Sequence, residues 1–234
     1  LGEVEIVESF LKYNDIQEMS AHHQKACQLM TRPTSAVSPH AVWGYGSPSV
    51  LTSYHRQSGA LDAEVQTMYR SMPFWYQLNP NQGSGSEHIM EGEVFFLRGQ
   101  LVDAEICLYR GLADANEHKQ LMIIFAAHFL RLRIEAFRGN FKDVERTLRE
   151  LRELADAQQE YMLLHTADVC EAWLYSLFGQ TEPQAEWIAQ GLLENTRLLH
   201  PSFPLLHMVY GQVLLAQGEY VPLIAREAQM RRLY

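Results

Sequence analysis

The chain has 234 residues, of which 47% are hydrophobic and 20% are charged. This balance is typical of a folded globular protein and excludes a disordered tail, a collagen-like repeat and a mucin stalk. The formal net charge of −9 repels phosphate, so we expect no direct contact of this chain with nucleic acid.

Three cysteines, Cys27, Cys107 and Cys170, are widely spaced and form no Cys-x-x-Cys motif. They indicate reducing surroundings rather than a disulfide scaffold or a zinc site, and we expect them to be small core residues. No apolar run reaches the roughly 18 residues of a membrane-spanning helix, and no signal peptide is visible. We therefore expect a cytoplasmic protein without membrane contact.

A repeat with a period near 40 residues runs along the chain. Turn residues followed by similar short segments recur at Asn14, Gly59, Gly99, Gly139, Gly179 and Gly218, and the glycines are 40, 40, 40 and 39 residues apart. Glycine and asparagine tolerate the left-handed backbone that closes a helix. An apolar residue two places after the turn begins the next helix at Leu61, Leu101, Phe141 and Tyr220, whereas Thr181 is a weak copy.

Apolar residues recur nine, five and two places before four of these glycines, as in Leu130, Ile134 and Phe137 before Gly139. This spacing places them on one face of a helix. The clearest second helix is predicted at residues 141–157, where Val144, Leu148, Leu151 and Leu154 form one stripe. Each unit is therefore predicted to be helix, turn, helix, and the fold class all-α.

Two segments depart from the repeat. Residues 31–47 and 73–86 are rich in proline and glycine, and we expect both to be loops, serving either as binding segments or as connectors. Because one helix pair cannot bury its own apolar face, the pairs should stack along residues 1–234 as a single elongated, curved array.

The turn motif with a glycine, then an apolar or aromatic residue and then an alanine resembles the tetratricopeptide superfamily, most closely at residues 99–104 and 139–141. The longer period, together with residues 11–23, 43–50 and 83–87, resembles the superhelical sensor region of the maltose-regulon activator family of LuxR-type bacterial transcription regulators. The resemblance implies a right-handed superhelix (an α-solenoid) of about five or six helix pairs.

The resemblance further implies an N-terminal nucleotide-binding domain, a C-terminal DNA-binding domain and a small inducer bound by the superhelix between them. Neither a phosphate loop nor a recognition helix occurs in this chain, so ATP and DNA binding are not expected of it. Because the chain begins at Leu1 without methionine and ends within a helical pattern, we expect it to be a piece of a longer protein.

Polar and aromatic residues recur at fixed distances from the turns, on a helix face away from the apolar stripe. Stacked first helices, which line the concave surface in tetratricopeptide-like arrays, would align them into a column. This predicted ligand-binding column comprises His88, Glu91, Phe95, His128, Arg131, Glu135, Glu171, Tyr175, His207 and Tyr210. The column suits a small polar molecule or an extended peptide, although a solvated helix face gives the same pattern.

Other motifs are weaker. His22 and His23 point to different sides of a helix, so a metal site with Cys27 is not expected. The aromatic run 74–76 favours packing over base stacking, and no acid, base and nucleophile cluster together, so we expect neither an enzyme nor a cofactor. Two functions remain, namely a ligand-sensing domain and a scaffold for a peptide or partner helix, with self-association possible through terminal repeats.

Overall fold

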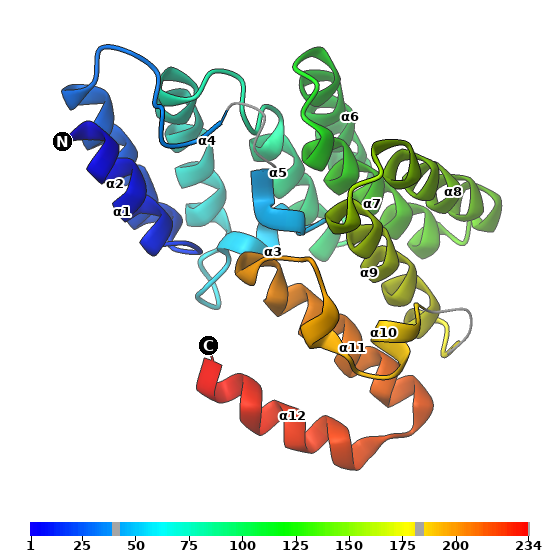
Figure 1. Cartoon of the computed structure of the whole chain (residues 1–234). Coiled ribbons are helices and arrows are strands. Elements are labelled where there is room, and N and C mark those ends of the chain that lie inside the picture. Colours follow the sequence, from blue (N-terminus) through cyan, green and yellow to red (C-terminus); the bar gives the residue numbers. More distant parts are fainter. Residues whose placement is uncertain (39–42, 181–184, 234) are drawn as a thin grey trace.

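The computed structural model describes residues 1–38, 43–180 and 185–233, which contain twelve α-helices, three short 3₁₀ segments and no strand (Figure 1). The all-α prediction is thereby confirmed. The α-helices are α1 (Gly2–Leu11), α2 (Ile16–Leu29), α3 (Val50–Tyr54), α4 (Leu61–Leu78), α5 (Ser86–Leu97), α6 (Leu101–Glu117), α7 (Leu121–Arg138), α8 (Phe141–Gln158), α9 (Tyr161–Leu177), α10 (Glu186–Ala189), α11 (Phe203–Gln217) and α12 (Tyr220–Leu233). The 3₁₀ segments are η1 (Trp43–Gly46), η2 (Leu193–Asn195) and η3 (His200–Ser202).

All six expected turn residues have a left-handed backbone, with φ of 63° at Asn14 and 66–85° at the five glycines. A Cβ built on any of these five glycines would meet no atom within 4 Å. Glycine is therefore required there by backbone conformation and not by crowding. The next helices begin where the sequence predicts, at Leu61, Leu101, Phe141 and Tyr220.

The apolar stripe before the turns is buried only in part. The residues nine and five places before the last four glycines are at most 4% exposed, as Leu130 and Ile134 illustrate. Three of the residues two places before are exposed instead, at 61% for Leu97, 67% for Phe137 and 45% for Leu177. These side chains lie at helix ends beside the turns, where Phe137 makes a T-shaped contact with Phe96, with 5.2 Å between ring centroids.

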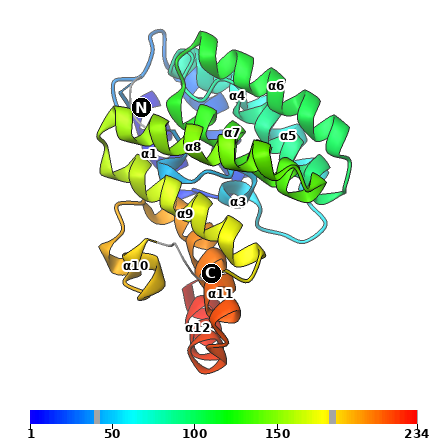
Figure 2. The same ribbon diagram turned by 90° about the vertical axis from the view of Figure 1, so that its right-hand side faces the viewer.

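Each long helix packs against the next long helix (Figure 2), and the chain curves so that α1 and α11 lie on two sides of η1 and α3 (Figure 1). Two large apolar cores result. One joins α1, α2, α4 and α5 to the start of α7, and the other joins α7, α8, α9 and α11. Segment η1 contacts α7, α9 and η3, so it connects the two halves of the chain.

Two expectations about breaks in the helices were wrong. Helix α4 continues through Pro73 to Leu78, because burial of Met72, Trp75 and Leu78 in the N-terminal core outweighs the hydrogen bond that proline removes. The unit after Gly179 has only the single-turn helix α10 in place of a full second helix, followed by η2 and η3. The weak copy at Thr181 lies outside the described residues.

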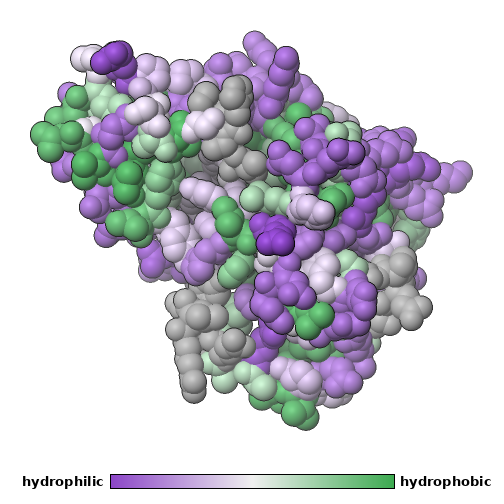
Figure 3. Space-filling model, in the orientation of Figure 1, coloured by the Kyte–Doolittle hydropathy of each residue, from purple (hydrophilic) through white to green (hydrophobic). Residues whose placement is uncertain are grey.

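The surface shown in Figure 3 has apolar side chains over the N-terminal helices. On α1, Val4, Val7 and Leu11 are at least half exposed, and on α12 so are Tyr220, Val221 and Ile224. Helix α1 packs on α2, and α12 packs on α11. Within the described part of the chain, no helix combines the length and apolarity needed to cross a bilayer.

Candidate functional site

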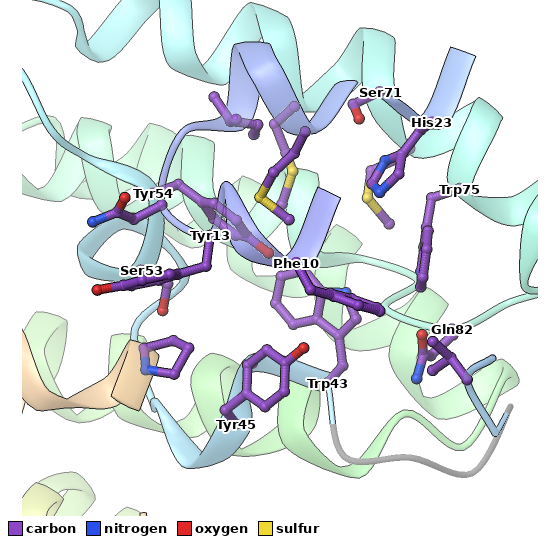
Figure 4. Close-up of a pocket in the computed structure, with 18 residues that line it drawn as sticks. Phe10, Tyr13, His23, Trp43, Tyr45, Ser53, Tyr54, Ser71, Trp75 and Gln82 are labelled. Carbon is purple, nitrogen blue, oxygen red and sulfur yellow. The ribbon is translucent and has the colours of Figure 1, made fainter. Parts of the chain in front are cut away.

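A cavity of about 180 Å³ lies between α1, α2, α4 and the segment that contains η1 and α3 (Figure 4). Its wall is mainly aromatic and thioether. Six aromatic side chains line it, namely Phe10, Tyr13, Trp43, Tyr45, Tyr54 and Trp75, and the apolar part also includes three methionines, Met19, Met68 and Met72, with Ile16, Val37 and Pro201. Such a wall is typical of sites for small organic molecules.

The polar part of the wall is small and uncharged. Asn14, His23, Ser53, Ser71 and Gln82 contribute it together with the tyrosine hydroxyls, and none of the described residues lining the cavity is Asp, Glu, Lys or Arg. Burial lowers the pKa of His23 to about 4, so its ring is neutral at pH 7. In Figure 4, His23, Ser71, Trp75 and Gln82 lie on one side of the cavity, and Ser53 and Tyr54 lie on the other. The described part of the wall therefore has no formal charge at pH 7.

Segment η1 reaches the cavity through an unusual backbone. Gly44, Tyr45 and Gly46 have successive φ values of 76°, 54° and 86°. A left-handed tyrosine is strained, and such residues concentrate at ligand-binding and switch segments. Glycine is needed at Gly83 for two reasons, because its φ is 80° and because a Cβ there would lie 2.5 Å from Nε1 of Trp43. The two glycine-rich segments thereby fit against each other and hold the Trp43 indole at the cavity.

The same segment is tied to the C-terminal half. The carbonyl oxygen of Tyr45 accepts a hydrogen bond from Leu199 N at 3.2 Å and lies 2.9 Å from Ser202 Oγ, whose single hydrogen is shared with the Leu199 carbonyl at 2.6 Å. The Gly46 carbonyl lies 3.0 Å from Thr166 Oγ1, whose hydrogen is shared with the Met162 carbonyl at 2.8 Å. Pro201 lines the cavity itself. A ligand in this cavity therefore contacts parts of both halves of the chain.

The predicted column lies elsewhere, and its members on α5 contact helices α4 and α6. The hydroxyl of Tyr69 on α4 donates to Glu91 Oε2 at 2.6 Å and lies 2.8 Å from Nδ1 of His88. The other ring nitrogen of His88 lies 3.5 Å from Asp114 of α6. Phe95 is partly buried and packs against the small apolar cluster of α6 and α7.

The members on α7 pair mainly with α8 and with their own turn. His128 Nδ1 and Arg131 Nη1 lie 3.6 and 3.3 Å from the same carboxylate oxygen of Glu150. Glu135 is only 8% exposed and accepts a hydrogen bond from Nδ2 of Asn140 at 2.6 Å. Burial lowers the pKa of His128, so this ring too favours its neutral form.

The column residues on α9 and α11 also contact neighbouring helices. Glu171 accepts a hydrogen bond from Arg152 of α8 at 2.5 Å, and burial raises the pKa of Tyr175 on the same helix. His207 Nδ1 lies 3.1 Å from the guanidinium of Arg226 on α12, which also covers the ring of Tyr210. The described contacts of the column thus run to neighbouring helices, no column residue lines the cavity, and its role in binding stays a prediction.

Sequence reasoning missed the cavity although it singled out much of its wall. The His22–His23 pair, the aromatic run 74–76 and the loop 31–47 were each noted separately, and His23, Trp75, Trp43 and Tyr45 lie in or beside them. Nothing in their spacing indicates that they meet. The usable signal is the concentration of aromatic residues in segments that interrupt the repeat.

No family model, curated protein or solved structure matches this chain.

Proposed function

We propose that this chain is a tetratricopeptide-like superhelical domain that senses a small molecule for a larger bacterial regulator. The single observation that favours sensing is the preformed aromatic cavity in the N-terminal half of the chain, whose η1 wall is hydrogen-bonded to the C-terminal half. The left-handed turns at a spacing near 40 residues support the superhelical repeat. The family resemblance supports a cytoplasmic, LuxR-type transcription regulator with flanking nucleotide-binding and DNA-binding domains.

The mechanism that we propose is a population shift. A ligand can change the arrangement of the halves only by the difference between its affinities for two arrangements. Because η1 lines the cavity and also bonds residues 199–202, a ligand that fits one placement of η1 favours one placement of the C-terminal half. A bias of about 3 kcal/mol needs roughly 150-fold tighter binding to the favoured arrangement.

A thermal-shift screen tests ligand sensing. Small molecules of neutral, anionic and cationic classes, sugars and amino acids included, are added to the purified chain. A ligand at 100 times its Kd stabilises the folded state by about 2.7 kcal/mol, which raises the Tm of a chain this long by roughly 5 °C or more. A screen without any such rise contradicts the sensing function.

The assignment to a regulator is tested separately, by the full gene product. We expect a phosphate-loop segment before this domain and a basic helix-turn-helix segment after it. A full-length product that lacks both contradicts the regulator assignment and leaves the thermal-shift result to decide on ligand binding alone.

A second candidate is a scaffold that docks a peptide or partner helix. It is favoured by the exposed rings along the turns, Phe137, Phe141 and Phe178, of which the last two lie 5.6 Å apart between centroids. Titration with amphipathic helical peptides tests it, with Phe137→Ser and Phe178→Ser as variants. Binding that both variants weaken supports the scaffold; an absence of binding contradicts it.

A further inference from the structure

Two residues that line the cavity, His23 and Trp75, each have a buried polar atom without a partner in the described part of the chain. Nδ1 of His23 and Nε1 of Trp75 are both shielded from solvent, and neither has a hydrogen-bond partner within the described residues. The two side chains are 6% and 5% exposed, and their rings lie next to each other, 4.8 Å apart between centroids. Leaving a buried polar atom unpaired costs about 1–3 kcal/mol, so two such atoms side by side require an explanation.

The neighbouring hydrogen bonds fix which atom donates and which accepts. The hydroxyl of Ser9 donates its hydrogen to the Ile6 carbonyl at 2.7 Å, so it accepts from the Nε2–H of His23 at 3.2 Å. Burial keeps the His23 ring neutral, with its pKa lowered to about 4, so Nδ1 has no hydrogen and is an acceptor. The indole nitrogen of Trp75 can only donate. The pair therefore offers one donor and one acceptor.

The size and charge of the cavity limit the ligand further. An engineered apolar cavity of about 150 Å³ binds benzene in another protein, so 180 Å³ holds a molecule of about one aromatic ring. An ionic ligand is disfavoured, because none of the described residues that line the cavity is charged and could offset the ligand's loss of hydration.

We propose that this cavity binds a neutral molecule of about one aromatic ring that carries a hydroxyl or primary amide group. Such a group can donate its hydrogen to Nδ1 of His23 and accept, through its oxygen, the N–H of Trp75. The aromatic body packs among Phe10, Tyr45 and Met72. This inference rests on the proposed sensing function and names the ligand class of its site.

Four probes of similar size test the ligand class by calorimetric titration and NMR. Phenol and benzamide satisfy both polar atoms, toluene satisfies neither, and benzoate carries a charge. We expect phenol and benzamide to bind about tenfold or more tighter than toluene and benzoate, since one to two net hydrogen bonds separate them. In the unmodified chain, phenol should also shift the indole N–H resonance of Trp75, whereas toluene should shift it less.

Variants locate the effect. Trp75→Phe and His23→Leu each remove one polar partner and keep an apolar side chain, so each should reduce the preference for phenol over toluene several-fold. The matched control is Trp187→Phe, which alters a second stacked His–Trp pair, His165 with Trp187, whose indole already donates to Asp168 at 2.8 Å. The control should leave the preference unchanged.

Several results would overturn the inference. These are equal binding of toluene and phenol, preference for benzoate, no binding of any of the four probes, or a preference for phenol that survives both variants. A different result would contradict the sensing function itself, namely a broad thermal-shift screen in which no molecule of any class stabilises the chain. A charged molecule that stabilises the chain and leaves the Trp75 resonance unmoved would refute the ligand class and retain the sensing function.

Discussion

The buried ion pair of Glu93 on α5 and Arg133 on α7 offers the sharpest test of the packing. Glu93 is fully buried and Arg133 is 9% exposed. One carboxylate oxygen of Glu93 pairs with the guanidinium, and the other accepts a hydrogen bond from the backbone N–H of Leu51 at 2.8 Å, at the start of α3. The guanidinium also lies over the ring of Phe129, 4.6 Å from its centroid. The pair thus joins three helices.

Replacing one partner should be far more damaging than replacing both. Glu93→Gln keeps an acceptor for Leu51 but leaves the Arg133 charge buried without its counter-ion. Arg133→Met leaves the Glu93 carboxylate buried without a positive partner. Each single change should cost about 3–5 kcal/mol. The double variant buries no charge and has two groups of similar volume, so it should cost less than either single variant, even after loss of a cation–π contact of about 2 kcal/mol.

Urea denaturation followed by far-UV circular dichroism gives the unfolding free energy of the four proteins. Two independent single changes would sum to about 6–10 kcal/mol, which is most of the stability of a typical domain. We expect the double variant to remain folded and to recover several kcal/mol relative to that sum. A double variant as unstable as the sum of the two singles would refute the assignment of this pair as one buried unit.

Three further predictions concern pH, the turns and the column. Burial lowers the pKa of His23 from 6.5 to about 4, so protonation of this ring disfavours the folded state. The contribution of His23 to the free energy of unfolding is therefore complete above pH 6.5 and falls by about 3 kcal/mol as the pH drops to 4. In a profile of unfolding free energy against pH, His23→Phe should remove this decrease. Gly139→Ala should cost about 1 kcal/mol from backbone strain alone, whereas Gly85→Ala should cost more than about 2 kcal/mol by melting, since its Cβ would lie 2.3 Å from a carbonyl of α6. The double change Glu91→Ala with Arg131→Ala should weaken ligand or peptide binding and leave the dichroism intact if the column is a site; unchanged titration curves would remove it.

The helices and turns could be predicted because their signals are local. A left-handed residue at the end of each helix and an apolar residue two places later define each turn, and both recur at Gly99 and Gly139 without regard to tertiary contacts. Burial of the stripe nine and five places before the glycine follows from helix geometry. Exposure of Phe137 does not follow, because it depends on how far each helix extends past its neighbour.

Prediction failed where distant packing overrides a local signal. Pro73 is a helix breaker by itself, but Trp75 and Leu78 anchor the following turn in the core, so α4 continues. The cavity depends on contacts between residues that are even farther apart in the sequence, since Tyr13 and Trp43 line it together with Pro201. No spacing rule along one helix contains that information.

The contrast between the column and the cavity has a physical reason. Residues at the same position in every unit are expected to make the same contact in every unit. The column residues on α7 and α11 fit this expectation, because they pair with the second helix of their own unit, as Arg131 does with Glu150. A site for one small molecule is needed once. Its residues therefore belong where the period is interrupted, and the segments 43–54 and 190–202, which interrupt the series of long helices, meet at Tyr45 and Ser202 beside the cavity. In a repeat array, the search for a specific site should begin with the segments that do not repeat.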